Sequence, residues 1–139
     1  FRVYATTEWA IYNDRPEYVG TTFLYVSPGI DDGDIIYQVR LKIEPSDNPN
    51  ILYVKAVRLG VKMMERAIHD IEHGTVHPTV LLKKGDLYLG DMFTPRKRDM
   101  TWRKLRKGMM SDYLKNKDSR DKHVLDAMVN DFKNIDRVG

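Results

Sequence analysis

The sequence contains no cysteine among its 139 residues. Disulfide scaffolds, zinc sites with thiolate ligands and cysteine nucleophiles are therefore excluded. The sequence also lacks an apolar run long enough to cross a bilayer, and residues 1–16 have no uncharged apolar core of the kind that a signal peptide needs. We expect a cytoplasmic protein with no membrane association.

The length and composition fit one globular domain. Apolar residues make up 42% of the chain and charged residues 31%, which separates it from disordered proteins. A chain of 139 residues leaves little room for a second core, so we predict a single domain over 1–139.

The positive charge is concentrated in one segment. Residues 94–122 carry 11 Lys and Arg against 4 Asp and Glu, whereas residues 1–93 carry 10 against 13. The net charge is therefore +7 over residues 94–122 and −3 over residues 1–93, although the whole chain has only +3. Clustered charge creates a local field that the same charge spread over the surface does not.

Residues 1–45 predict three strands in an antiparallel meander. Residues 1–12 alternate between apolar and polar side chains, and 21–27 is a second run rich in β-forming residues. An acidic turn with Asp31, Asp32 and Asp34 then leads into 35–44, where Tyr37 and Val39 lie on the apolar side. The turn resembles a calcium loop only in composition, because it lacks the twelve-residue spacing and the terminal Glu.

A long helix is predicted over 48–74. Asn48 suits the N-cap, Pro49 the first turn and Gly74 the C-terminal stop. Apolar residues keep helical spacing from Val54 to Ile71, with Leu52, Leu59 and Met63 widening the stripe, and we expect this face to pack on the sheet. The opposite, solvated face carries the following basic residues: Lys55, Arg58, Lys62, Arg66, His69 and His73.

The rest of the chain is less regular. Residues 77–93 form either a strand or a hairpin that turns at Lys83–Asp86. Within 94–139, residues 101–117 predict a basic helix with Gly108 in its middle, and 120–135 predicts a C-terminal helix.

This order of elements is similar to that of the ribonuclease H-like superfamily. ValTyrAlaThrThrGlu at 3–8 resembles its first strand, residues 50–61 its first helix and residues 80–89 its fourth strand. The resemblance implies an α+β or α/β fold with a three-stranded meander, a long helix, a further strand and C-terminal helices. The family holds two metal ions with carboxylates, and those positions fall here on Thr6, Tyr53, Gly85 and, roughly, His123.

None of these four residues is a carboxylate, so the resemblance implies a degenerate member without a catalytic metal site. We therefore predict no enzyme activity, no catalytic residues and no cofactor. His69 and His73 in HisAspIleGluHis match the spacing of a zinc-binding helix, but they also continue the solvated face. We interpret them as solvated histidines and predict no metal site.

The basic segment is the strongest functional signal. Lys and Arg neutralise phosphates, and an aromatic side chain among them can stack on a base. The predicted nucleic-acid-binding residues are Arg96, Lys97, Arg98, Trp102, Arg103, Lys104, Arg106 and Lys107, with Lys55, Arg58 and Lys62 on the long helix. The competing interpretation is a solvated basic face with Trp102 in the core.

The sequence thus predicts a non-enzymatic accessory protein that binds RNA or DNA, of a kind found in viruses and mobile elements, located in the host cytosol if viral. The alternative is an inhibitor or adaptor whose basic face binds an acidic host protein. A third interpretation is an enzyme with an unrecognised active site. The sequence does not distinguish RNA from DNA or define the oligomeric state.

Overall fold

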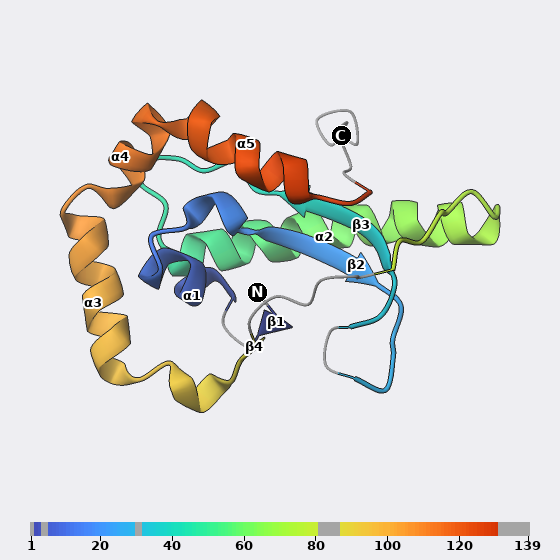
Figure 1. Ribbon diagram of the computed structural model, residues 1–139, viewed down its shortest axis with the longest axis horizontal. Coiled ribbons are helices and arrows are strands. Elements are labelled where there is room, and N and C mark those ends of the chain that lie inside the picture. Colours follow the sequence, from blue (N-terminus) through green and yellow to red (C-terminus); the bar gives the residue numbers. More distant parts are fainter. Residues whose placement is uncertain (1, 4–5, 30–31, 81–86, 131–139) are drawn as a thin grey trace.

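The computed structural model describes residues 2–3, 6–29, 32–80 and 87–130 as a mixed α/β structure (Figure 1). Strand β1 (Arg2–Val3) pairs in parallel with β4 (Leu87–Tyr88). Strands β2 (Gly20–Leu24) and β3 (Ile35–Arg40) form an antiparallel hairpin, in which Gly20 lies opposite Arg40. In the described residues no helix is long and apolar enough to cross a membrane.

Residues 6–12 form helix α1 (Thr6–Tyr12) rather than a strand. Its buried side chains include Thr7, Ala10 and Ile11, whose spacing is helical. The strand predicted from the alternation along 1–12 is therefore wrong for residues 6–12, and the three-stranded meander predicted for 1–45 is not formed. A short 3-10 helix, η1 (Pro16–Tyr18), connects α1 to β2.

Helix α2 (Pro49–Glu72) confirms the predicted long helix and its ends. The Asn48 side chain accepts hydrogen bonds from the backbone N–H groups of Asn50 and Ile51 at 3.0 and 3.1 Å. Gly74 follows the helix with a φ of +65°, a left-handed conformation that glycine adopts without strain. The hairpin covers part of α2, whose last turns extend beyond it (Figure 1).

The buried face of α2 coincides with the predicted stripe only in part, at the residues that widen it. Leu52, Met63 and Ala67 are buried, whereas Val61 is 60% exposed. Leu52 joins the main core, which is completed by Ala10, Ile11, Val19, Leu41, Ile43, Met110 and Tyr113. The core is therefore built between α1, the residues that flank the hairpin, α2 and α4, and Val61 lies outside it.

The C-terminal half contains η2 (Gly90–Met92), α3 (Pro95–Arg106), α4 (Met109–Lys115) and α5 (Lys117–Ala127). Gly108, at a φ of +89°, divides the predicted basic helix 101–117 into α3 and α4. Helix α5 begins before the predicted start at 120 and ends at Ala127, and residues 131–139 lie outside the described part. The predicted turn at Lys83–Asp86 also lies outside it, and before this gap Thr79 makes a single antiparallel bridge with Ile35.

Candidate functional site

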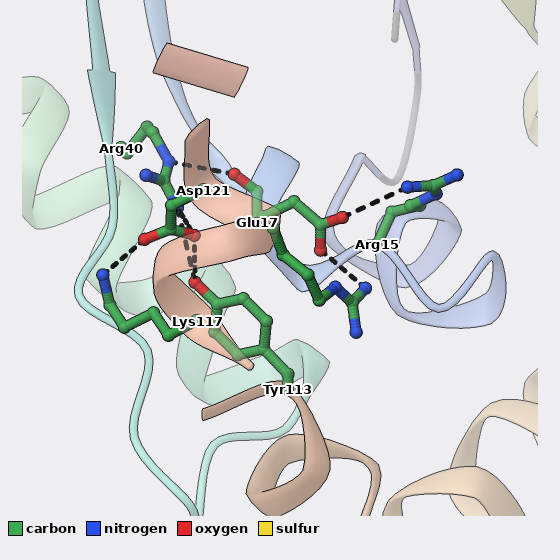
Figure 2. Close-up of polar contacts among 7 residues, drawn as sticks. Arg15, Glu17, Arg40, Tyr113, Lys117 and Asp121 are labelled. Carbon is green, nitrogen blue, oxygen red and sulfur yellow. Dashed lines mark hydrogen bonds and ion pairs between the residues drawn. The ribbon is translucent and has the colours of Figure 1, made fainter. Parts of the chain in front are cut away.

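A buried carboxylate, Asp121, joins the hairpin to the C-terminal helices (Figure 2). Its Oδ1 accepts hydrogen bonds from Arg40 Nη2 at 2.6 Å and from the Tyr113 hydroxyl at 2.7 Å, and its Oδ2 pairs with Lys117 Nζ. Arg40 Nε also donates to the backbone oxygen of Glu17 at 3.0 Å. One ionic cluster therefore connects η1, β3, α4 and α5.

A second buried carboxylate, Glu17, lies beside the first (Figure 2). Its Oε2 is 2.8 Å from Arg120 Nη2, and its Oε1 is 3.4 Å from Arg15 Nη1. Arg120 also donates to the backbone oxygen of Asp14. Two cations thus satisfy Glu17, as buried carboxylates require.

The partners of Asp121 determine its protonation state. Burial raises the pKa of a carboxyl group, but the hydrogen bonds from Arg40, Lys117 and Tyr113 outweigh it and lower the pKa of Asp121 to about 2. Burial and the hydrogen bond to Asp121 raise the pKa of the Tyr113 hydroxyl. Asp121 is therefore ionised at neutral pH and is unsuited to act as a general base.

A cavity of about 210 Å³ with a mixed polar and apolar lining adjoins this cluster, between the hairpin and α5. Thr22, Gln38 and Arg40 line it from the hairpin, and Val124 and Met128 close it from the C-terminal side. The amide oxygen of Gln38 accepts a hydrogen bond from the backbone N–H of Val129 at 3.0 Å, which orients the amide. The lining can donate hydrogen bonds to a carbonyl oxygen, a chemistry that suits acyl groups.

A second cavity, of about 300 Å³, lies where α1, α2 and α3 meet. Arg98 and Trp102 of α3 face Glu8 of α1 and Asn50 of α2 across it. Two of the predicted nucleic-acid-binding residues therefore line a cavity between helices. Trp102 is half-buried there. It is therefore neither a fully exposed side chain free to stack on a base nor a fully buried core residue, which were the two interpretations of the sequence.

The predicted basic residues of α3 have different environments. Lys97 Nζ lies 4.5 Å from the centre of the Trp9 ring and donates to the backbone oxygen of Met92. Lys104 Nζ binds the backbone oxygen of Tyr12 at 2.6 Å and Asp14 Oδ2 at 2.7 Å. Both lysines therefore attach α3 to its neighbours.

The remaining basic side chains of α3 and its C-terminus are exposed. Arg103 forms an ion pair with Asp99 at 2.8 Å on the helix surface. The exposed set consists of Arg96, Arg98, Arg103, Arg106 and Lys107. They give α3 a basic outer surface.

The basic residues predicted on the long helix differ in their environments. Lys55 Nζ binds Glu44 Oε2 at 2.7 Å and Asp47 at 2.8 Å, so it connects α2 to the segment before it. Arg58 and Lys62 are exposed. Their part in binding nucleic acid stays a prediction.

The two candidate metal-binding histidines face each other on α2. The rings of His69 and His73 stack with centroids 4.1 Å apart, and His73 Nδ1 contacts the backbone oxygen of His69 at 2.7 Å. His69 Nδ1 is 3.2 Å from Asp70 Oδ1. Within the described ranges, no three His, Cys, Asp or Glu side chains are grouped to hold a metal ion.

Asp70 forms another buried carboxylate cluster. The Tyr37 hydroxyl donates to Asp70 Oδ2 at 2.6 Å, and Arg66 Nε binds both carboxylate oxygens. Although burial opposes ionisation, hydrogen bonds from Tyr37, Arg66 and His69 lower the pKa of Asp70 to about 2. Burial and the bond to Asp70 raise the pKa of Tyr37 to about 12.

Sequence reasoning missed Asp121, Glu17 and Asp70. Asp121 and Glu17 each also bind a distant cation, 81 and 103 residues away, which the sequence does not reveal. The local signals are the spacings of Arg66 with Asp70 and of Lys117 with Asp121, each four residues apart on one helix, and the position of Arg15 two residues before Glu17.

Comparison with known proteins contradicts the predicted family. No protein-family model matches the sequence. The chain is 35% identical over 78 residues to methionyl-tRNA formyltransferase from Phocaeicola vulgatus, an alignment that covers 56% of this chain and 24% of the relative. The same enzyme from Bacteroides thetaiotaomicron is 33% identical over 78 residues, with the same coverage. The chain thus spans about a quarter of the length of these relatives.

A solved structure gives the same indication. The crystal structure of a 4-N formyltransferase from Francisella tularensis matches with a TM-score of 0.61 and 19% sequence identity. The match covers 73% of this chain and 46% of that one. The described residues therefore share the fold of part of a formyltransferase, and the ribonuclease H-like prediction is wrong.

These findings also correct the predicted function. The relatives are enzymes, so they contradict a non-enzymatic nucleic-acid-binding protein of viral type and do not favour the inhibitor or adaptor alternative. The four positions tested for metal-binding carboxylates belonged to the wrong family, so their lack of carboxylates does not argue against catalysis.

Proposed function

We propose that this chain forms part of a formyltransferase that transfers a formyl group to a nitrogen atom of its acceptor. The identity of 35% over 78 residues to a methionyl-tRNA formyltransferase carries the proposal. The fold likeness to a 4-N formyltransferase supports it independently of sequence, at 19% identity.

The chemistry of this transfer sets two requirements. An amine attacks the formyl carbon, so the carbonyl oxygen gains negative charge that hydrogen-bond donors must stabilise. The bond between the formyl carbon and its donor then breaks and the donor leaves with the electron pair, while the proton released by the amine passes to a base that can return it to the departing donor. The cavity beside Arg40 supplies donors through Thr22 and Gln38, and we propose that it takes part in binding the formyl or acceptor group.

The base is not Asp121, because a carboxylate with a pKa of about 2 and three donors does not accept a proton at neutral pH. The ionic cluster has a different role in this proposal: it holds α5 against the hairpin and so forms the wall of the cavity. We propose Arg40 and Asp121 as positioning residues.

The acceptor is proposed from the basic surface of α3. A phosphate-bearing acceptor such as methionyl-tRNA would contact Arg96, Arg98 and Arg106, which are exposed. RNA would then be a substrate of an enzyme rather than the partner of a binding protein. The cytoplasmic location predicted from composition stays a proposal, as does the single domain over 1–139.

A hybrid enzyme tests the function. The matched 78-residue segment of the Phocaeicola vulgatus enzyme is replaced by the corresponding segment of this chain, and transfer of an isotopically labelled formyl group to methionyl-tRNA is measured. We expect the hybrid to retain activity above that of a control with an unrelated segment of equal length. A folded hybrid that is no more active than this control would contradict the proposal.

A further inference from the structure

Six apolar side chains form an exposed stripe along α2. Their exposed fractions range from 41% for Ile71 to 60% for Val61, so the described residues leave the stripe uncovered. We call this set the α2 stripe; its members are Val54, Val57, Val61, Met64, Ile68 and Ile71. An apolar stripe of this length beside an already buried helix face indicates a second packing partner.

The spacing of the stripe fits a helix as the partner. Successive members are three, four, three, four and three residues apart, which is the repeat of a seam between two packed helices. One side of the seam is bounded by the hairpin, because Gly60 lies next to Thr21 and Ala67 is buried. The other side is bounded by the charged residues Arg58 and Glu65.

The sizes of the side chains favour an antiparallel partner with the same sequence. The first half of the stripe holds three valines, and the second half holds Met64, Ile68 and Ile71. In an antiparallel pair, Val54 faces the second copy's Ile71 and Val61 faces its Met64, so every layer combines a smaller and a larger side chain. A parallel pair would stack like on like, so the first half of the interface would have thin layers and the second half thick ones, which pack less evenly.

The flanking charges are complementary in the same arrangement. With Val61 opposite Met64 of the other copy, Arg58 lies beside the other copy's Glu65, and symmetry repeats the pair. A parallel pair would not bring these two positions together. Size and charge therefore select the same orientation.

We propose that the α2 stripe is a homodimer interface in which two copies of α2 pack antiparallel. This interface is separate from the cavity beside Arg40 and does not depend on the proposed formyl transfer. It buries the stripe and leaves the basic surface of α3 outside.

Cysteine cross-linking tests the orientation directly, because the chain has no cysteine of its own. The double variant Val54→Cys with Ile71→Cys should form a covalent dimer under mild oxidation. The two positions are about 25 Å apart within one helix, far beyond disulfide reach, so the bond must join two copies. Each single variant should stay uncross-linked, whereas cross-linking of the Val54→Cys variant alone would indicate a parallel pair and overturn the proposal.

Sedimentation equilibrium tests the interface. Val61→Asp should raise the dimer dissociation constant roughly thirtyfold or more, whereas Lys62→Asp on the solvated face should change it by less than about twofold. Arg58→Glu should weaken the dimer, and adding Glu65→Arg should restore it. Circular dichroism verifies that each variant is folded.

Two results would overturn the interface. One is a folded chain that stays monomeric at every concentration. A monomer whose stripe is covered by another polypeptide belongs to this case. A dimer that Val61→Asp leaves intact uses a different surface.

Discussion

Asp121 and Glu17 are buried carboxylates that bind cations from distant parts of the chain (Figure 2). Their contribution to the stability of the fold depends on all of their partners together, because a buried charge that loses one partner still carries its full cost of desolvation. The same holds for Asp70 with Tyr37 and Arg66.

Removing the charge of Asp121 should destabilise the fold. We expect Asp121→Asn to lower the free energy of unfolding by about 3 kcal/mol, because Arg40 and Lys117 lose their shared counter-ion. Urea denaturation measures the change. Asp118→Asn is the control, since this residue is exposed on the same helix, and its effect should stay within about 0.5 kcal/mol. Equal effects of the two changes would contradict a stabilising role for the cluster.

The low pKa values of Asp70 and Asp121 predict a dependence of stability on pH. Both are lowered from 3.8 to about 2 by folding, so the folded state binds protons less readily than the unfolded state. Their contribution is complete above about pH 4 and is lost as the pH falls towards 2. Urea unfolding across this range should show the loss, and the double variant Asp70→Asn with Asp121→Asn should flatten it. An equally steep loss in the double variant would assign it to other groups.

At the scale of elements, α2 shows why helix ends are easier to predict than helix faces. Asn48 and Gly74 act through the backbone beside them, so their roles can be deduced from local sequence.

The cap of α2 provides a local test. Asn48→Ala should cost about 1 kcal/mol of stability, because two backbone N–H groups lose their acceptor. Thermal unfolding measures it, and Asn50→Ala two residues later should cost nothing, since alanine favours the helix. Equal thermal stability of the two variants would show that the Asn48 cap does not stabilise the helix.

The buried face of α2 was predicted only in part, at Leu52 and Met63, because most of the predicted apolar stripe does not contact the core. Ala56, Gly60 and Ala67 allow the hairpin and α1 to approach closely, and small residues carry little hydrophobic signal. Residues 6–12 were misassigned for a related reason: a short run with apolar residues at 9 and 11 fits a strand as well as a helix. In the candidate site, the basic character of α3 was visible, but the anchoring roles of Lys97 and Lys104 depend on contacts with α1.

At the scale of the whole molecule, the charge block of 94–122 divides into anchors and an exposed surface. Lys104 and Lys97 hold α3 against α1, so they belong to the fold. Arg103 pairs with Asp99, and Arg96, Arg98, Arg106 and Lys107 remain for an anionic acceptor.

This division predicts which residues govern binding of RNA. Changing Arg96, Arg98 and Arg106 together to Ala should weaken binding of tRNA, because two to three phosphate contacts are lost. The slope of the logarithm of the affinity against the logarithm of the salt concentration should become shallower by roughly 2 to 3. Fluorescence anisotropy at several salt concentrations measures both. The triple variant Lys42→Ala, Lys115→Ala, Lys122→Ala removes the same charge from exposed positions elsewhere and should have a smaller effect. Equal effects would show that only net charge matters.

The ion pair between Glu17 and Arg120 spans 103 residues, and the one between Arg40 and Asp121 spans 81. During synthesis on a ribosome that adds about 5 to 20 residues per second, Glu17 precedes its cation by roughly 5 to 20 seconds. Throughout that interval Arg15 is the cation available to Glu17, and the ion pair with Arg120 cannot form. The contacts that join η1 and β3 to α5 are therefore made only after α5 has been translated.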